Sequence, residues 1–153
     1  MVNRKKHIPK FYFKFYLVSN YWFMKKVFLG GTCNGSSWRD RLIKDLKIKY
    51  YQPQSEDWTP AMMEEEIKQR AECDFCLYVI TPKMTGVYSI AEVVDDSNKR
   101  PKKTLFCYLH SDAGTQFSAV QIRSLEQTGK MIKKNGAQFL KSLDEVSDYL
   151  NNQ

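Results

Sequence analysis

The sequence predicts an α/β protein with a parallel sheet of about five strands between two layers of helices. Apolar segments typical of strands alternate with longer helical patterns along most of the chain. The uninterrupted apolar run Phe75–Ile80 is typical of a strand that is buried on both faces, as strands of parallel sheets are. Because each strand is followed by a helix, we expect helices on both faces of the sheet.

The predicted strands are short, apolar and bounded by turn residues. In chain order they are Lys26–Gly30, Ile48–Gln52, Phe75–Ile80, Thr104–Leu109 and Ala137–Leu140. Pro53 ends the second of them, because proline cannot donate a hydrogen bond to the sheet. A polar loop over residues 110–117 follows the fourth, and His110 is expected to be a polar residue of that loop.

A helical pattern follows each predicted strand. The expected helices run from Trp38 to about Leu46, from Pro60 to about Ala71, through Glu92 to about Asn98, from about Ser118 to Lys134, and from Ser142 to the end of the chain. Ser37, Thr59 and Ser142 are the predicted N-cap residues. In the second helix, the spacing of Met63, Ile67 and Ala71 by four predicts a buried stripe.

The formal net charge of +7 comes from the start of the chain, since residues 1–26 hold seven Lys and Arg and no Asp or Glu. The remaining residues are neutral overall, so the charge does not indicate binding to a nucleic-acid polymer. Residues 1–23 are basic and aromatic, and the apolar run is too short and interrupted to span a membrane. This leader is an extra edge strand, a membrane-surface contact or upstream sequence before a natural start at Met24; we favour the last. Residues 24–153 are expected to form one domain.

The chain has four cysteines, and two of them form the pair Cys73-x-x-Cys76. A zinc site would need a second pair of ligands, and the histidines His7 and His110 do not supply it. We therefore expect no metal, small buried thiols at Cys76 and Cys107, and a reducing, cytoplasmic compartment.

The most informative segment is Thr81–Glu92, which joins the buried strand Phe75–Ile80 to a helix. Ligands of open α/β sheets bind at the carboxyl ends of the strands, so a carboxylate at Glu92 is predicted to face the crevice. Ser89 and Glu92 also fit a capping box, and the local sequence alone favours that interpretation. Asp95 and Asp96, further along the same helix, are expected at the surface.

Two other loops follow predicted strands. The segment Gly30–Ser37 offers backbone N–H groups and hydroxyls that can hold an anion, and it fits a capped turn equally well. In the second loop, Asp57 can accept hydrogen bonds from a sugar or base and Trp58 can stack on a ring, although a loop Trp can also simply cover the sheet. Most of the run Glu64–Glu66 is expected to be solvated, with Glu66 able to pair with Arg70.

Several phrases in one order resemble the nucleoside 2-deoxyribosyltransferase family over roughly residues 26–109. They are Val27–Thr32, Asp57–Pro60, Asp74, Tyr78–Pro82 and Thr85-Gly86 through Ala91-Glu92. The resemblance implies a flavodoxin-like, doubly wound sheet and no cofactor. It also implies a nucleoside or nucleotide substrate and a homo-oligomer whose segment 111–121 reaches a neighbour's site.

The resemblance further implies that Glu92 is the nucleophile and that the acidic Glu66 assists at the base. The family's transferases often carry Asp where this chain has Gly86, and they carry Tyr where it has Phe28. Thr85, next to Gly86, is the expected substitute for the missing Asp. The candidate substrate-binding residues are Phe28, Gly30, Gly31, Thr32, Asn34, Ser36, Arg39, Asp57, Trp58, Thr85, Gly86 and Ser89. A non-catalytic nucleotide-binding module and an NAD-type N-glycoside hydrolase remain the alternatives.

Overall fold

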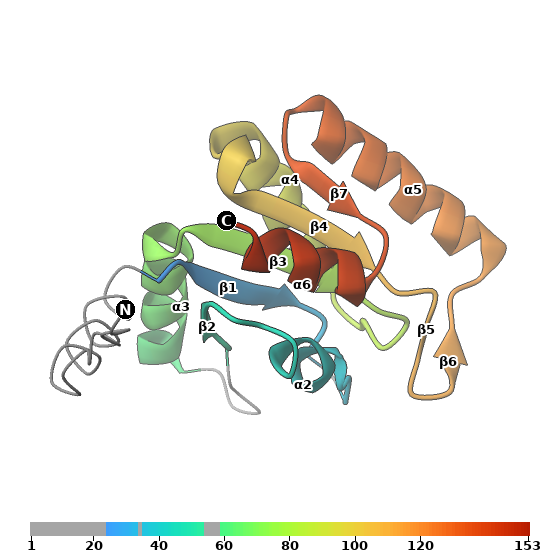
Figure 1. The fold of residues 1–153 in the computed structure, drawn as a ribbon. Coiled ribbons are helices and arrows are strands. Elements are labelled where there is room, and N and C mark those ends of the chain that lie inside the picture. Colours follow the sequence, from blue (N-terminus) through green and yellow to red (C-terminus); the bar gives the residue numbers. More distant parts are fainter. Residues whose placement is uncertain (1–23, 34, 54–58) are drawn as a thin grey trace, which may run out of the picture.

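A computed structural model describes residues 24–33, 35–53 and 59–153 of the chain. Its centre is a five-stranded sheet in which all neighbouring strands run parallel, in the order β2-β1-β3-β4-β7 (Figure 1). The strands are β1 Lys26–Gly31, β2 Lys49–Tyr51, β3 Phe75–Ile80, β4 Thr104–Tyr108 and β7 Gln138–Leu140. The predictions for residues 1–23 fall outside the described part.

This strand order confirms the predicted flavodoxin-like, doubly wound sheet. The chain begins in the interior at β1, adds β2 on one side, and then crosses to β3 on the other. The order therefore reverses between β1 and β3. In sheets of this kind, the crevice at the carboxyl ends of the two strands at the reversal is the usual place for a ligand.

Helices cover both faces of the sheet, which gives three layers (Figure 1). They are α2 Trp38–Ile43, α3 Pro60–Glu72, α4 Tyr88–Lys99, α5 Ala119–Lys134 and α6 Leu143–Asn151, with a short 3-10 turn, η1 Pro101–Lys103, before β4. Successive residues of β3 alternate between the faces, as a pleated strand requires. One core joins Cys76, Tyr78 and Ile80 to α4 and α5, and the other joins Phe75, Leu77 and Val79 to α2 and α6.

Helix α3 differs from the prediction. The predicted stripe is wrong: Met63 is 53% exposed, Ile67 is 64% exposed, and Ala71 is exposed as well. No residue of α3 is buried. Glu66 and Arg70 line a pocket under the helix, so α3 stands over a cavity instead of a packed apolar core. Spacing by four identifies a face of a helix, but it does not tell what covers that face.

The segment predicted as a polar loop contains a short antiparallel hairpin, β5 Ser111–Asp112 and β6 Thr115–Gln116. Its Asp112 is buried, accepts a hydrogen bond from the Ser36 hydroxyl, and pairs with Arg41 at 3.9 Å. A buried carboxylate needs such partners, because an unpaired charge is costly away from water. These contacts attach the hairpin to the loop before α2.

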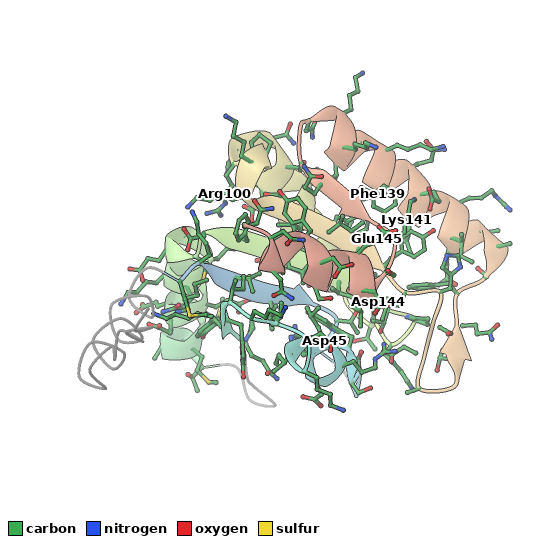
Figure 2. All side chains as sticks on the ribbon, viewed as in Figure 1. Asp45, Arg100, Phe139, Lys141, Asp144 and Glu145 are labelled. Atoms are coloured by element: carbon green, nitrogen blue, oxygen red, sulfur yellow. The ribbon has the colours of Figure 1, made fainter. Side chains whose placement is uncertain are left out.

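Two of the three predicted N-caps are confirmed. Thr59 and Ser142 accept backbone N–H groups of the first helical turn at 3.3 and 3.1 Å. Ser37 stands at the N-cap of α2 but makes no side-chain hydrogen bond there, so its capping role is wrong. Glu145, in the first turn of α6, also accepts the backbone N–H of Lys141 at 2.8 Å, and Figure 2 shows the two side by side.

At Gly31 the backbone of β1 lies close against the backbone of β3. Its φ is +113°, a conformation that L side chains rarely adopt. A Cβ at this position would lie 2.1 Å from the carbonyl oxygen of Val79. The next residue, Thr32, donates its backbone N–H to the same oxygen at 2.9 Å. Glycine at position 31 is therefore needed to bring the first loop against β3.

The substitution Gly31→Ala should lower the free energy of unfolding by about 2 kcal/mol or more, because it combines backbone strain with a backbone clash. Gly86→Ala is the matched control, since a Cβ there meets no atom within 4 Å. Equilibrium denaturant unfolding measures both. Equal midpoints for the two variants would contradict the expectation.

Candidate active site

A pocket of about 420 Å³ opens at the carboxyl ends of β1 and β3, at the reversal of strand order. A cavity of this size suits a small organic molecule. The first loop, α3 and the start of α4 form its walls. The lining residues are Gly30, Gly31, Thr32, Cys33, Arg39, Pro53, Met63, Glu66, Ile67, Arg70, Met84, Thr85, Gly86, Tyr88, Ser89 and Glu92.

Glu92 lies on the wall formed by α4 and is only 9% exposed. The helix begins at Tyr88 after the N-cap Val87, so Glu92 is its fifth residue and not part of the first turn. The predicted capping box of Ser89 and Glu92 is therefore wrong. Arg70 Nη1 donates to Glu92 Oε1 at 3.0 Å. Among the described residues no hydrogen-bond donor reaches Oε2, so within this part of the structure only one of the two carboxylate oxygens is held.

The surroundings of Glu92 make its carboxyl group a weaker acid than usual. Burial raises its pKa to about 7, and the nearby Arg70 guanidinium opposes that rise. The carboxylates of Glu66 and Asp96 also raise the pKa, whereas Arg100 lowers it. A carboxyl group that titrates near neutrality inside a pocket is a candidate for acid, base or nucleophilic chemistry.

Asp96 lies one helical turn beyond Glu92 and is fully buried, so its predicted surface location is wrong. Its carboxylate accepts from Arg70 Nε at 2.9 Å, from Arg100 Nε at 2.8 Å and from the Tyr78 hydroxyl at 2.5 Å. Burial acts to raise the pKa of Asp96, but these hydrogen bonds outweigh it and hold the pKa below its usual range. Asp95, in contrast, is exposed, as expected; it pairs with Lys99 at 2.9 Å and lies 3.9 Å from Arg70 Nη2.

Glu66 faces the pocket from α3 and is half-buried. Burial raises its pKa, and the charges of Arg70 and Arg39 act against the rise. The predicted pairing of Glu66 with Arg70 is not formed, because the guanidinium of Arg70 points to α4 instead. The pocket thus holds two carboxyl groups with raised pKa values, one on α3 and one on α4.

Arg39 fastens the first loop to β1 from inside the fold. Its guanidinium donates to the backbone oxygens of Leu29 at 2.9 Å and Thr32 at 2.7 Å, and lies over the Trp38 ring at 4.4 Å. The Thr32 hydroxyl in turn accepts the backbone N–H of Thr81 at 2.9 Å. Because the Arg39 guanidinium is bonded to the backbone of β1 and of the first loop, it fixes the shape of this wall of the pocket.

The structure gathers most of the candidate residues in the pocket. Those that line it are Gly30, Gly31, Thr32, Arg39, Glu66, Thr85, Gly86, Ser89 and Glu92. Phe28 is fully buried in the sheet and stacks on Tyr51, and Ser36 bonds Asp112 outside the pocket. Asn34, Asp57 and Trp58 lie outside the described residues. Asp74 lies at the other end of β3 and accepts the backbone N–H of Lys26 at 2.9 Å.

Several residues of the pocket were not predicted from the sequence. The most important is Arg70, which the sequence indicates only as a possible ion-pair partner of Glu66. The others are Cys33, Pro53, Met63, Ile67, Met84 and Tyr88. An arginine four residues after a pocket carboxylate was the available signal, because residues four apart lie on one helix face. Exposed apolar side chains carry no such signal in a single sequence.

The family model described as nucleoside 2-deoxyribosyltransferase like matches residues 24–111. The match runs from the start of β1 through β4 and covers both pocket carboxylates, Glu66 and Glu92. The chain belongs to this family. No curated protein and no solved structure matches the chain significantly.

Within the described residues, no group of three or more His, Cys, Asp or Glu side chains is arranged to hold a metal ion. Cys73, Cys76 and Cys107 are buried, as predicted for the last two, and Cys33 is exposed at the pocket. None of the helices in this part of the chain is both long and apolar enough to cross a bilayer.

The substitution Asp96→Asn should lower the free energy of unfolding by about 3 kcal/mol, because it removes the fully buried counter-charge of two partly buried guanidinium groups. Asp95→Asn, on the same helix but exposed, should change it by less than about 1 kcal/mol. Denaturant unfolding at neutral pH compares the two. Similar losses for both would show that the buried cluster contributes no special stability.

Proposed function

We propose that this member of the nucleoside 2-deoxyribosyltransferase-like family cleaves or exchanges the N-glycosidic bond of a nucleoside or nucleotide, with Glu92 as the nucleophile. The observation that carries the proposal is the carboxylate of Glu92, which lines the pocket between β1 and β3 and has one oxygen, Oε1, bonded to Arg70. The raised pKa of the Glu66 carboxyl group, which lines the same pocket from α3, supports a second, proton-donating role for that residue.

The proposed reaction has two displacements at one carbon. Glu92 Oε2 attacks C1′ of the sugar, the bond from C1′ to the base breaks, and its electron pair leaves with the base. Protonated Glu66 gives its proton to the departing base, which leaves a glycosyl ester on Glu92. A second base or water, deprotonated by Glu66, then attacks C1′ and releases the Glu92 carboxylate. Two inversions retain the configuration at C1′.

The walls of the pocket divide into a polar and an apolar part. Thr32, Thr85 and Ser89 carry hydroxyl groups that suit a sugar, whereas Met63 and Tyr88 offer surface to the flat face of a base. In the proposed site, Thr85 stands in for the Asp that the family's transferases often place at Gly86. The choice between water and a second base as acceptor decides whether the protein is a hydrolase or a transferase.

Incubation with deoxynucleosides and deoxynucleotides, with and without a free acceptor base, should release a base or form an exchanged nucleoside. Glu92→Gln should lower kcat by at least about 1,000-fold, because the nucleophile is lost. Glu64→Gln, an exposed carboxylate on α3, should leave kcat unchanged. Stabilisation by a nucleotide without turnover would indicate a binding module, and release of nicotinamide from NAD would indicate the alternative hydrolase. Full activity of Glu92→Gln would exclude the proposed nucleophile.

The proposed active form is a homo-oligomer in which a second copy covers the mouth of the pocket. Exposed apolar side chains line the pocket or lie next to a lining residue, on α3 and at the start of α4; they are Met63, Ile67, Val87 and Tyr88. Exposed apolar groups that cluster around a site are typical of an interface. The segment 111–121 is the proposed contribution of the second copy.

Light scattering of the purified chain should give a multiple of the 18.0 kDa chain mass. Val87→Glu should shift the mass toward a single chain, because it places a charge in the proposed interface. Met131→Glu, which places the same charge at an exposed apolar residue of α5 outside the segment 111–121, is the control and should leave the mass unchanged. A monomeric wild-type protein at high concentration would contradict the proposal.

A further inference from the structure

We propose that Arg70 is a positioning residue for Glu92, and that Asp96 makes this positioning rigid by fixing the guanidinium of Arg70. The inference rests on the proposed function, because it assigns a role to residues that do not themselves form a bond with the sugar. In this role Arg70 orients the Glu92 carboxylate before substrate binds.

The guanidinium of Arg70 bridges two carboxylates of α4. Nε and Nη2 donate to the two oxygens of Asp96 at 2.9 and 2.7 Å, which is a two-pronged contact. Nη1 donates to Glu92 Oε1 at 3.0 Å, and Nη2 also lies 3.3 Å from the backbone oxygen of Glu92. Because the guanidinium is planar and rigid, fixing one edge on Asp96 also fixes the direction of Nη1.

Asp96 is held independently of Arg70. Arg100, at the end of α4, places Nη2 2.7 Å from its Oδ1, and Tyr78 of β3 donates its hydroxyl to Oδ2. Asp96 is fully buried, so water does not compete for these bonds. The backbone oxygen of Arg70 is also held, by Arg100 Nη1 and by the Cys76 thiol, each at 3.2 Å. Both ends of Arg70 are therefore fixed.

A fixed Arg70 determines which oxygen of Glu92 can react. The Glu side chain has three rotatable bonds, and its carboxylate would otherwise sample several orientations. The hydrogen bond to Oε1 selects one of them and leaves Oε2 without a described donor. Misplacement of a reacting atom by about 1 Å costs on the order of 100-fold in rate, so holding one oxygen bears directly on attack by the other.

The same contact affects the charge of Glu92. The charged groups that face Glu92 are Arg70 and Glu66 from α3, Asp96 on α4, and Arg100 at the end of α4. Arg70 is the cation in direct contact with its carboxylate. Because a nearby cation favours the ionised form, removal of Arg70 should raise the pKa of Glu92 further above about 7. A smaller fraction of the protein would then carry the nucleophilic carboxylate at neutral pH.

The test compares Arg70→Met and Arg70→Lys with Lys68→Met, which removes an exposed positive charge from the same helix. In Arg70→Met, kcat should fall about 100-fold with a smaller change in KM, because positioning acts on the attack. The acid limb of the kcat profile should move up by at least about one pH unit. Arg70→Lys should restore the acid limb but not kcat, because an ammonium supplies charge without the planar fork. Lys68→Met should match the wild type.

Two further measurements keep the result interpretable. Tyr78→Phe removes one donor to Asp96 without changing any charge, and kcat should fall several-fold in a protein that remains folded by circular dichroism. Carbon-13 NMR titration of Glu92 in the free protein, with Glu92→Gln to assign the signal, reports its pKa without turnover. If no form of the protein releases a base, the proposed function is wrong, and the titration still decides whether Arg70 holds Glu92. An unchanged Glu92 pKa in Arg70→Met, or a kcat within threefold of wild type, would overturn the inference.

Discussion

The buried carboxylate of Asp96 is the contact on which the rest of this site depends. It joins Arg70 of α3, Arg100 at the end of α4 and Tyr78 of β3 around one fully buried group. Its guanidinium partners keep its pKa low and its hydroxyl partner retains a proton, so the cluster remains charged and bonded inside the fold. A charge in this position is tolerated only because its oxygens have donors on several sides.

These hydrogen bonds between Arg70 and Asp96 explain how α3 is attached to α4 although no residue of α3 is buried. An apolar stripe on α3 would pack down onto the sheet and fill the space between them, as α4 and α5 do on the same face. An arginine reaching across to α4 instead keeps the helix at a distance, and the pocket occupies the intervening space. The attachment of α3 through Arg70, in place of an apolar core, therefore leaves room for the pocket.

Much of this fold is predictable from the sequence, because its strongest signals are local. The apolar run of β3, the glycine-rich end of β1 and the caps at Thr59 and Ser142 each mark an element, and their order determines a doubly wound sheet. The position of Glu92 after β3 likewise places it at the carboxyl edge. The failures concern partners distant in sequence. Asp95 and Asp96 are neighbours in the sequence, but only Asp96 is buried, where it accepts hydrogen bonds from Tyr78 of β3 and from Arg70 of α3, both many residues earlier.

The strand order has a consequence for the time at which the pocket forms during folding. β1 lies in the interior of the sheet, but the register that pairs Val27 with Phe75 requires a loop containing α2, β2 and α3 to close first. Such long-range parallel pairing is slow, because the entropy of loop closure is lost before the contacts form. On a ribosome, the first loop would therefore emerge well before Val79, the residue against which Gly31 and Thr32 must settle. The wall formed by the first loop is therefore complete only after two segments that lie far apart in the sequence have paired.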